Sequence, residues 1–383
     1  MELYIHIPFC LQKCRYCDFA SYAGCASLMH PYVDAVLKEA RQEAERLEHP
    51  LIETIFIGGG TPSLLPAEEL KRLLQGIAEL FPFAQDIEFT SEANPGTLTE
   101  TWLETAVSAG INRLSMGMQA AQPRLLQLLG RIHSMPEVIH SVEMVRHAGI
   151  ADLNLDLMFG LPTQTVEDWQ ETLRTALELA PEHLSCYGLI PEEGTPMKQD
   201  LDSGRLVLPD EDTERMMYDL TLKILAQHGY QQYEISNFAL PGHACRHNLG
   251  YWRQVPYLGL GSSSASMLPS GDDSVAYVRR SNPAGIRAYL SMMEQGDFSA
   301  REETCISPTE AQFETLMLGL RTTQGVREAD YAAMHGASME ARYGKTLERL
   351  KLQGLLLHED GCWRLTRRGM DVQNAVLVEL MEE

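Results

Sequence analysis

The first half of the chain alternates between short apolar runs and longer stretches with helically spaced apolar residues. Apolar runs predict six β-strands, at 3–7, 53–62, 86–95, 111–119, 151–162 and 183–191. Amphipathic helices are predicted between them, at 31–48, 67–80, 99–110, 136–149 and 166–179. Strand–helix units in register imply parallel strands joined by right-handed crossovers. The pattern therefore predicts an α/β fold with a partial (β/α)6 barrel.

The ends of these predicted strands are polar or rich in glycine. They carry a cysteine loop at 10–17, the segment 58–62, Ser91-Glu92, Met118-Gln119, Asp156 and Pro191-Glu192. Barrels of this kind place their chemistry at the carboxyl ends of the strands. We therefore expect these residues to share one active face.

The pattern changes after residue 211. A helix is predicted at 211–229, followed by an irregular, aromatic and small-residue-rich stretch. Three helices at 309–320, 328–336 and 339–354 precede a hairpin that turns at Asp360-Gly361. The predicted organisation is a barrel at 1–230, an irregular linker at 231–305, and an α+β, winged-helix-like domain at 306–383.

Composition and charge narrow the function classes. The 383-residue chain is 44% hydrophobic and carries a formal net charge of -22, which argues against nucleic acid as a partner. A winged helix with basic residues in 340–370 is weak support for DNA binding, because fold analogy alone says little about function. No secretory leader or membrane span is evident, and eight cysteines are too sparse for a disulfide scaffold. We expect a soluble cytoplasmic protein with reduced thiols.

The strongest chemical signal is the C-x3-C-x2-C spacing of Cys10, Cys14 and Cys17. Three thiolates on a cubane [4Fe–4S] cluster leave one iron without a protein ligand, and an open position can bind a small molecule. Zinc is the alternative, but it would want a fourth Cys or His nearby. Neither Cys25 nor His6 has a common finger spacing, so the cluster is favoured.

With Tyr4 and Tyr16 beside it, the cysteine motif resembles that of the radical S-adenosylmethionine (SAM) superfamily, in which the open iron chelates SAM. The blocks HIPFCxxxCxYCDF, GGGTP, SMGMQ and NLDLMFGLP are similar, in order, to the oxygen-independent coproporphyrinogen III oxidase family. This resemblance covers nearly the whole chain. It implies SAM-binding roles for Tyr4, Tyr16, Gly59, Gly60, Thr61, Glu92, Gln119, Arg131 and Asp156.

Three features separate the chain from the decarboxylating oxidases. The oxidases carry a fourth cysteine where this chain has Phe19, and they have an N-terminal extension before the barrel. The HNxxYW segment at 247–252 also resembles the haem chaperone branch of the family. That resemblance implies haem as cargo and haem-acceptor proteins as partners, and it admits a homodimer and peripheral contact with membrane acceptor proteins. The alternative is decarboxylation of coproporphyrinogen III to protoporphyrinogen IX.

The resemblance to the haem chaperone branch implies that haem binds near His247, Tyr251 and Trp252. Imidazole is the commonest axial ligand of haem iron, and aromatic rings stack on the macrocycle. A histidine that only makes hydrogen bonds, among core aromatics, is an equally good interpretation of the same residues. Relatives usually carry a histidine where this chain has Ala265. No catalytic residue is assigned.

Overall fold

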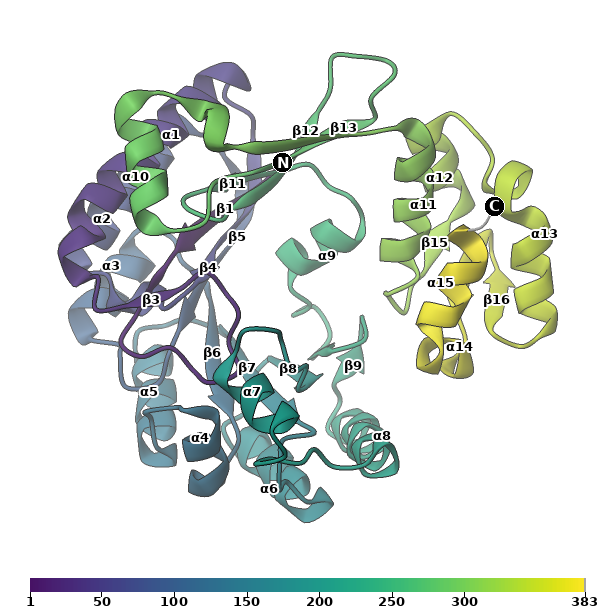
Figure 1. Cartoon of the computed structure of the whole chain (residues 1–383), viewed down its shortest axis with the longest axis horizontal. Helices are drawn as coiled ribbons and strands as arrows, with labels where there is room; N and C mark the ends of the chain where they lie inside the picture. The colour runs from purple at the N-terminus through teal and green to yellow at the C-terminus, as the bar shows by residue number, and fades with distance from the viewer. Residues whose placement is uncertain (382–383) are drawn as a thin grey trace.

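The computed structural model describes residues 1–381 and has a barrel-like domain with a smaller domain beside it (Figure 1). Six parallel strands form the middle of one large sheet, each paired with the next along the chain. They are β1 (Glu2–Ile7), β4 (Ile52–Gly59), β5 (Phe83–Ala93), β6 (Arg113–Gln119), β7 (Asp152–Phe159) and β8 (His183–Gly188). The prediction of a partial (β/α)6 barrel is confirmed.

Helices cover the outer face of this sheet (Figure 1). The helices of the barrel domain are α1 (Met29–Arg46), α2 (Ala67–Leu80), α3 (Glu100–Ser108), α4 (Pro123–Leu129), α5 (Met135–His147), α6 (Val166–Glu178), α7 (Pro196–Asp202) and α8 (Glu211–Gln227). Local signals set their ends: Ser134 and Glu137 form a capping box at the start of α5. Gly110 and Gly149 adopt positive φ just after α3 and α5, at the positions where the sequence predicts that these helices end.

The segment 231–305 is not an irregular linker, so that prediction is corrected here. It contains β9 (Gln231–Gln232), β10 (Asn237–Ala239), α9 (Arg246–Trp252), β11 (Tyr257–Leu260), β12 (Ala265–Pro269), β13 (Tyr277–Ser281), α10 (Ile286–Gln295) and β14 (Glu302–Ile306). These strands extend the sheet at both edges, and β11 lies parallel to β1. These strands contain small residues, which carry weak strand signals in the sequence. Close packing requires them: a Cβ on Gly259 would lie 2.1 Å from the Ala265 carbonyl oxygen, so only glycine fits.

The C-terminal domain has a hydrophobic core of its own, built around Tyr343, Leu347 and Trp363. Its elements are α11 (Pro308–Gly319), β15 (Val326–Arg327), α12 (Glu328–His335), α13 (Met339–Leu352), β16 (Leu356–Glu359), β17 (Cys362–Leu365), α14 (Arg367–Asp371) and α15 (Gln373–Met381). The predicted hairpin is present. Asp360 and Gly361 both have positive φ, as a two-residue type I′ turn requires.

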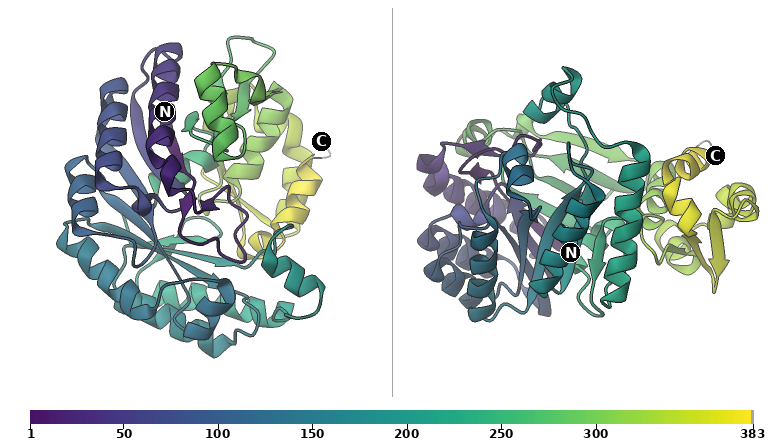
Figure 2. Two further views of the ribbon diagram at one scale, coloured as in Figure 1. Left: turned by 60° about the vertical axis from the view of Figure 1, so that its left-hand side comes forward. Right: turned by 90° about the horizontal axis from the view of Figure 1, so that it is seen from below.

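Charged side chains join this domain to the barrel domain. Arg321 pairs with Glu234 at 2.8 Å, Arg215 pairs with Asp371 at 2.8 Å, and Arg367 approaches Asp219 at 3.3 Å. The two domains form adjacent bodies in the views of Figure 2. The contact between them also includes an apolar cluster, in which Ala311 of α11 packs with Met267 and Tyr277.

Within residues 1–381, no helix combines the length and apolar character needed to cross a lipid bilayer.

Candidate metal and cofactor site

A cavity of about 430 Å³ opens at the carboxyl ends of the parallel strands. Its size is within the usual range for small-molecule and cofactor sites. The structure brings together most of the residues that the sequence pointed to on its walls: Cys10, Cys14, Tyr16, Cys17, Gly59, Gly60, Glu92, Gln119, Arg131 and Asp156. These residues of the expected face therefore line one cavity, whereas Ser91, Met118 and Pro191 are not on its wall.

The three cysteines lie on the loop that follows β1. This loop is held by the short strands β2 (Phe9–Cys10) and β3 (Tyr22–Ala23), and by a bond from the Arg15 N–H to the Leu129 carbonyl at 3.0 Å. The cysteines are free thiols of intermediate exposure. Among the described residues, no three His, Cys, Asp or Glu side chains converge on one point that could hold a single metal ion.

Cys10, Cys14 and Cys17 all line the same cavity. A cubane iron–sulfur cluster takes its cysteines on different irons, so three thiols on one cavity wall fit a cluster with three protein ligands.

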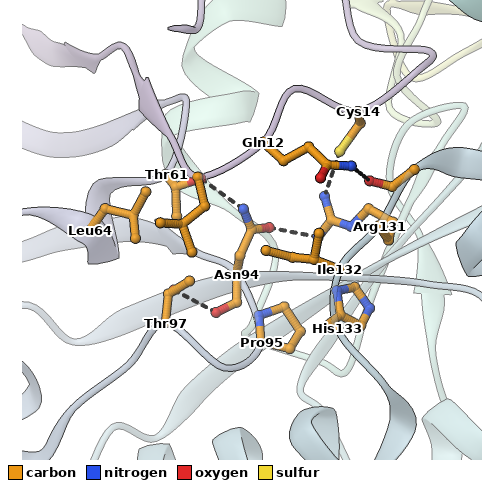
Figure 3. Close-up of a pocket in the computed structure, with 12 residues that line it drawn as sticks. Gln12, Cys14, Thr61, Leu64, Asn94, Pro95, Thr97, Arg131, Ile132 and His133 are labelled. Carbon is orange, nitrogen blue, oxygen red and sulfur yellow. Dashed lines mark hydrogen bonds between the residues drawn. The ribbon is translucent and has the colours of Figure 1, made fainter. Parts of the chain in front are cut away.

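Arg131 links the cysteine loop to Asn94 (Figure 3). Its Nη2 donates to Asn94 Oδ1 at 2.6 Å and to the Gly117 carbonyl at 2.8 Å, while Nη1 lies 3.5 Å from Cys14 Sγ. Asn94 in turn donates to Thr61 Oγ1 at 2.8 Å. Sequence reasoning missed Asn94, although an Asn-Pro pair directly after a strand was a usable signal.

Steric crowding explains why glycines stand at the end of β4. Gly59 has φ of +106°, and a Cβ there would lie 2.3 Å from the His6 ring. A Cβ on Gly60 would lie 2.7 Å from the Ile7 carbonyl oxygen. The Gly59 N–H donates to Glu92 Oε2 at 2.9 Å. Only glycine can carry the chain this close to the His6 ring and the Ile7 backbone.

Two half-buried carboxylates, Glu92 and Asp156, face the cavity. Burial, followed by the nearby charge of Asp156, raises the pKa of Glu92 to about 7. Burial also raises the pKa of Asp156, although Asn154 Nδ2 at 2.7 Å and Ser115 Oγ at 3.3 Å donate to its carboxylate. A cationic ligand with hydroxyl groups would relieve the mutual repulsion of the two acids.

Gln119 ends β6 in a strained conformation. Its φ of +65° is unusual for a residue other than glycine, and the β6–β7 register shifts between Gly117 and Gln119. The Tyr187 hydroxyl donates to Gln119 Oε1 at 3.1 Å and helps to hold this side chain. Strain of this kind gathers at ligand sites, where it costs about 1–3 kcal/mol.

Two of the proposed SAM residues lie behind the cavity and not on its wall. The Tyr4 hydroxyl pairs with His6 Nδ1 at 3.0 Å, and its ring stacks on Phe56 inside the barrel. Thr61 lines a small adjoining cavity of about 30 Å³, which shares Cys14, Asn94 and Arg131 with the larger one (Figure 3). Its Oγ1 lies 3.6 Å from Cys10 Sγ, so it contacts the cysteine loop directly.

The proposed haem residues lie on α9, away from the cysteine loop. His247 is buried, with Nδ1 at 2.8 Å from Thr54 Oγ1 and Nε2 at 2.9 Å from the Tyr251 hydroxyl. Burial lowers the pKa of His247 to about 3, so the imidazole is neutral. Ligation of iron by His247 would require one of these two hydrogen bonds to break.

Trp252 and Ala265 are also absent from the cavity wall. The Trp252 ring lies under the guanidinium group of Arg321, 4.6 Å from its Cζ. Ala265 begins β12 and pairs with Ser281 in the extended sheet.

An apolar rim borders the cavity mouth. Phe19 and Ile190 line the cavity, yet 62% and 70% of their surfaces are exposed. Met158 and Leu189 continue the apolar surface inward. These side chains give the cavity wall an exposed apolar part beside its polar part.

Comparisons with known proteins place this geometry in a family. Residues 4–176 match the model of the Radical SAM superfamily, and residues 306–372 match the HemN C-terminal domain. The heme chaperone HemW of Bacillus subtilis is 35% identical over 381 residues, which cover 99% of each chain. Escherichia coli heme chaperone HemW is 35% identical over 385 residues, covering 100% of this chain and 98% of the relative.

Among solved structures, the coproporphyrinogen III oxidase HemN from Escherichia coli, described as a radical SAM enzyme, has a similar fold. The TM-score is 0.84 at 23% identity, with 99% of this chain and 89% of that chain covered. This likeness shows the fold of both domains together.

Proposed function

The chain belongs to the HemW family of radical SAM proteins, and we propose that it is a haem chaperone. On this proposal it binds a [4Fe–4S] cluster and SAM, holds haem, and passes haem to acceptor proteins. The cavity between the cysteine loop and the strand ends would be the common site for these ligands.

The residues on the cavity wall suit their separate tasks. Cys10, Cys14 and Cys17 would hold the cluster, whose open iron would bind the amino and carboxylate groups of SAM. Glu92 and Asp156 face the same space and offer oxygen acceptors to the N–H groups of that amino group and to ribose hydroxyls. Gln119 and the backbone at Gly59 and Gly60 would position the rest of the molecule.

The apolar rim is the observation that carries the chaperone proposal. Phe19 stands where a decarboxylating oxidase would have a fourth cysteine, and it presents an exposed ring at the cavity mouth. Together with Ile190 it offers a surface for a flat apolar macrocycle. Cargo held at an open mouth can be handed on, whereas a substrate for radical chemistry must be enclosed away from water.

The partners follow from this role. Haem-acceptor proteins would dock over the cavity mouth, and we propose the cytoplasm as the location because its reducing conditions suit eight free cysteines. A homodimer and contact with membrane-bound acceptors remain part of the proposal.

Two measurements on anaerobically reconstituted protein test it. Titration with hemin should give saturable binding with a shift of the Soret band. Incubation with SAM, reductant and coproporphyrinogen III should leave the porphyrinogen intact. Formation of protoporphyrinogen IX would overturn the chaperone proposal in favour of the oxidase.

A further inference from the structure

We propose that Arg321 binds a carboxylate group of the ligand held in the cavity, namely a propionate of the porphyrin. This inference rests on the proposed function and adds a specific anchoring site to it. It also assigns a ligand-binding role to the C-terminal domain.

Arg321 reaches the cavity from the segment that follows α11. It lines the cavity, although α11 belongs to the C-terminal domain. Its Nε donates to Glu234 Oε2 at 2.8 Å, and its guanidinium group lies over the Trp252 ring with Cζ 4.6 Å from the ring centre. One edge and one face of the guanidinium group are therefore held in place.

The other edge of the group is available to a ligand. Within residues 1–381 the structure shows no hydrogen-bond partner for Nη1 or Nη2 of Arg321, and a third of the side chain is exposed. Glu234 also accepts bonds from the Ser236 N–H and Asn237 Nδ2, both at 2.7 Å, so it is fixed independently of Arg321. A guanidinium group held in this way presents its two terminal nitrogens as a planar fork that matches a carboxylate.

The charges around the cavity make this position distinctive. Among the described residues that line it, the two arginines are Arg131 and Arg321. Arg131 already donates to Asn94 and Gly117 and lies against Cys14. The acidic lining residues, namely Asp18, Glu92, Asp156 and Glu192, would repel a carboxylate elsewhere. Arg321 is thus the position on this wall that favours an anionic group.

The shape of a porphyrin agrees with this arrangement. Its propionates lie on one edge of an otherwise apolar plate. Phe19 and Ile190 supply apolar surface on the wall of the same cavity that Arg321 lines. A macrocycle on that rim can direct its acidic edge to Arg321.

The test compares two ligands and two arginines by absorbance titration of the full-length reconstituted protein. Arg321→Gln should weaken hemin binding by about tenfold or more, as expected for the loss of a charge-assisted bond. It should change binding of iron protoporphyrin IX dimethyl ester, which has no free carboxylate, by less than about twofold. Arg321→Lys should fall between wild type and Arg321→Gln, because it keeps the charge but loses the fork.

Arg367→Gln is the matched control. Arg367 also joins the C-terminal domain to the barrel domain, through Asp219 at 3.3 Å and the Tyr218 ring at 4.8 Å, but it is not on the cavity wall. It should leave hemin binding within about twofold of wild type. Equal losses in the two arginine variants, or equal losses of hemin and its ester in Arg321→Gln, would show that Arg321 only docks the domain.

The outcomes also separate this inference from the proposed function. Wild-type protein that binds hemin, with Arg321→Gln binding it equally well, would refute the anchoring role alone. Wild-type protein that binds neither hemin nor its ester would refute the chaperone proposal and the anchoring role together. Circular dichroism spectra that match wild type would show that the variants are folded.

Discussion

Replacement of His247 by alanine distinguishes a structural histidine from an iron ligand. In the structure both ring nitrogens already have partners, Thr54 on β4 and Tyr251 on α9. The ring also stacks on Phe56, with centroids 5.4 Å apart. We therefore expect His247 to stabilise the docking of α9 in the barrel and not to bind haem iron.

The size of the effect follows from the groups that the substitution leaves behind. The buried Thr54 hydroxyl would lose its partner at about 1–3 kcal/mol, and the part-buried Tyr251 hydroxyl would lose its partner at a smaller cost. The space vacated by the ring would add a cavity penalty, because the neighbouring strands cannot collapse fully. His247→Ala should therefore lower the free energy of unfolding by roughly 3–5 kcal/mol.

Urea unfolding followed by circular dichroism measures this change. His247→Asn and His247→Gln are matched controls, because each amide can replace one of the two ring nitrogens as a hydrogen-bond partner. Each should recover part of the lost stability. Without urea, all three variants should be folded and should bind hemin with a dissociation constant within about twofold of the wild-type value.

A different result would refute the reasoning. If His247→Ala abolishes the Soret shift while the unfolding curve stays unchanged, then the imidazole leaves its two partners to bind iron. The burial of His247 would then not indicate a purely structural role.

Three further predictions concern the cavity and the opposite end of the barrel. Cys14→Ala should lose most of its iron and sulfide in anaerobic preparations, because two thiolates hold a cubane poorly; unchanged iron content would contradict the cluster site. Wild-type affinity for SAM, a cation, should rise between about pH 6 and about pH 8 as Glu92 ionises around its pKa of about 7, and calorimetry should find this rise reduced in Glu92→Gln. Burial raises the pKa of Glu2 to about 8, so the folded chain keeps a proton that the unfolded chain loses above about pH 4.5. Stability should then fall by up to about 1.4 kcal/mol per pH unit as pH rises through that window, and urea unfolding of Glu2→Gln should show no such dependence.

The barrel and most of its cavity wall could be predicted from sequence. The spacing of apolar residues indicates the strands and helices, and the positions of the strand ends indicate the cavity wall. Parallel strands alternate with helices at regular intervals, and chemistry gathers where the strands end. Glu92, Gln119 and Asp156 come from three different strands, yet strand order alone brings them to one cavity. The turn at Asp360-Gly361 is similarly local, since two residues with positive φ define it.

The elements after residue 230 could not be predicted in the same way. β11 and β12 owe their place to close packing between backbones, as at Gly259, and small residues carry weak strand signals. The HNxxYW segment forms α9, and the residue types alone did not show that His247 would find partners on β4. Arg321 is 190 residues from Arg131 in the chain (321 minus 131), so only the fold shows that both reach one cavity.

The separate cores of the two domains bear on how firmly the domains hold to each other. Charged pairs made by Arg215, Arg321 and Arg367 contribute to the attachment of the C-terminal domain. Such pairs weaken as ionic strength rises, because mobile ions screen them. High salt should therefore loosen the junction between the domains before it unfolds either of them.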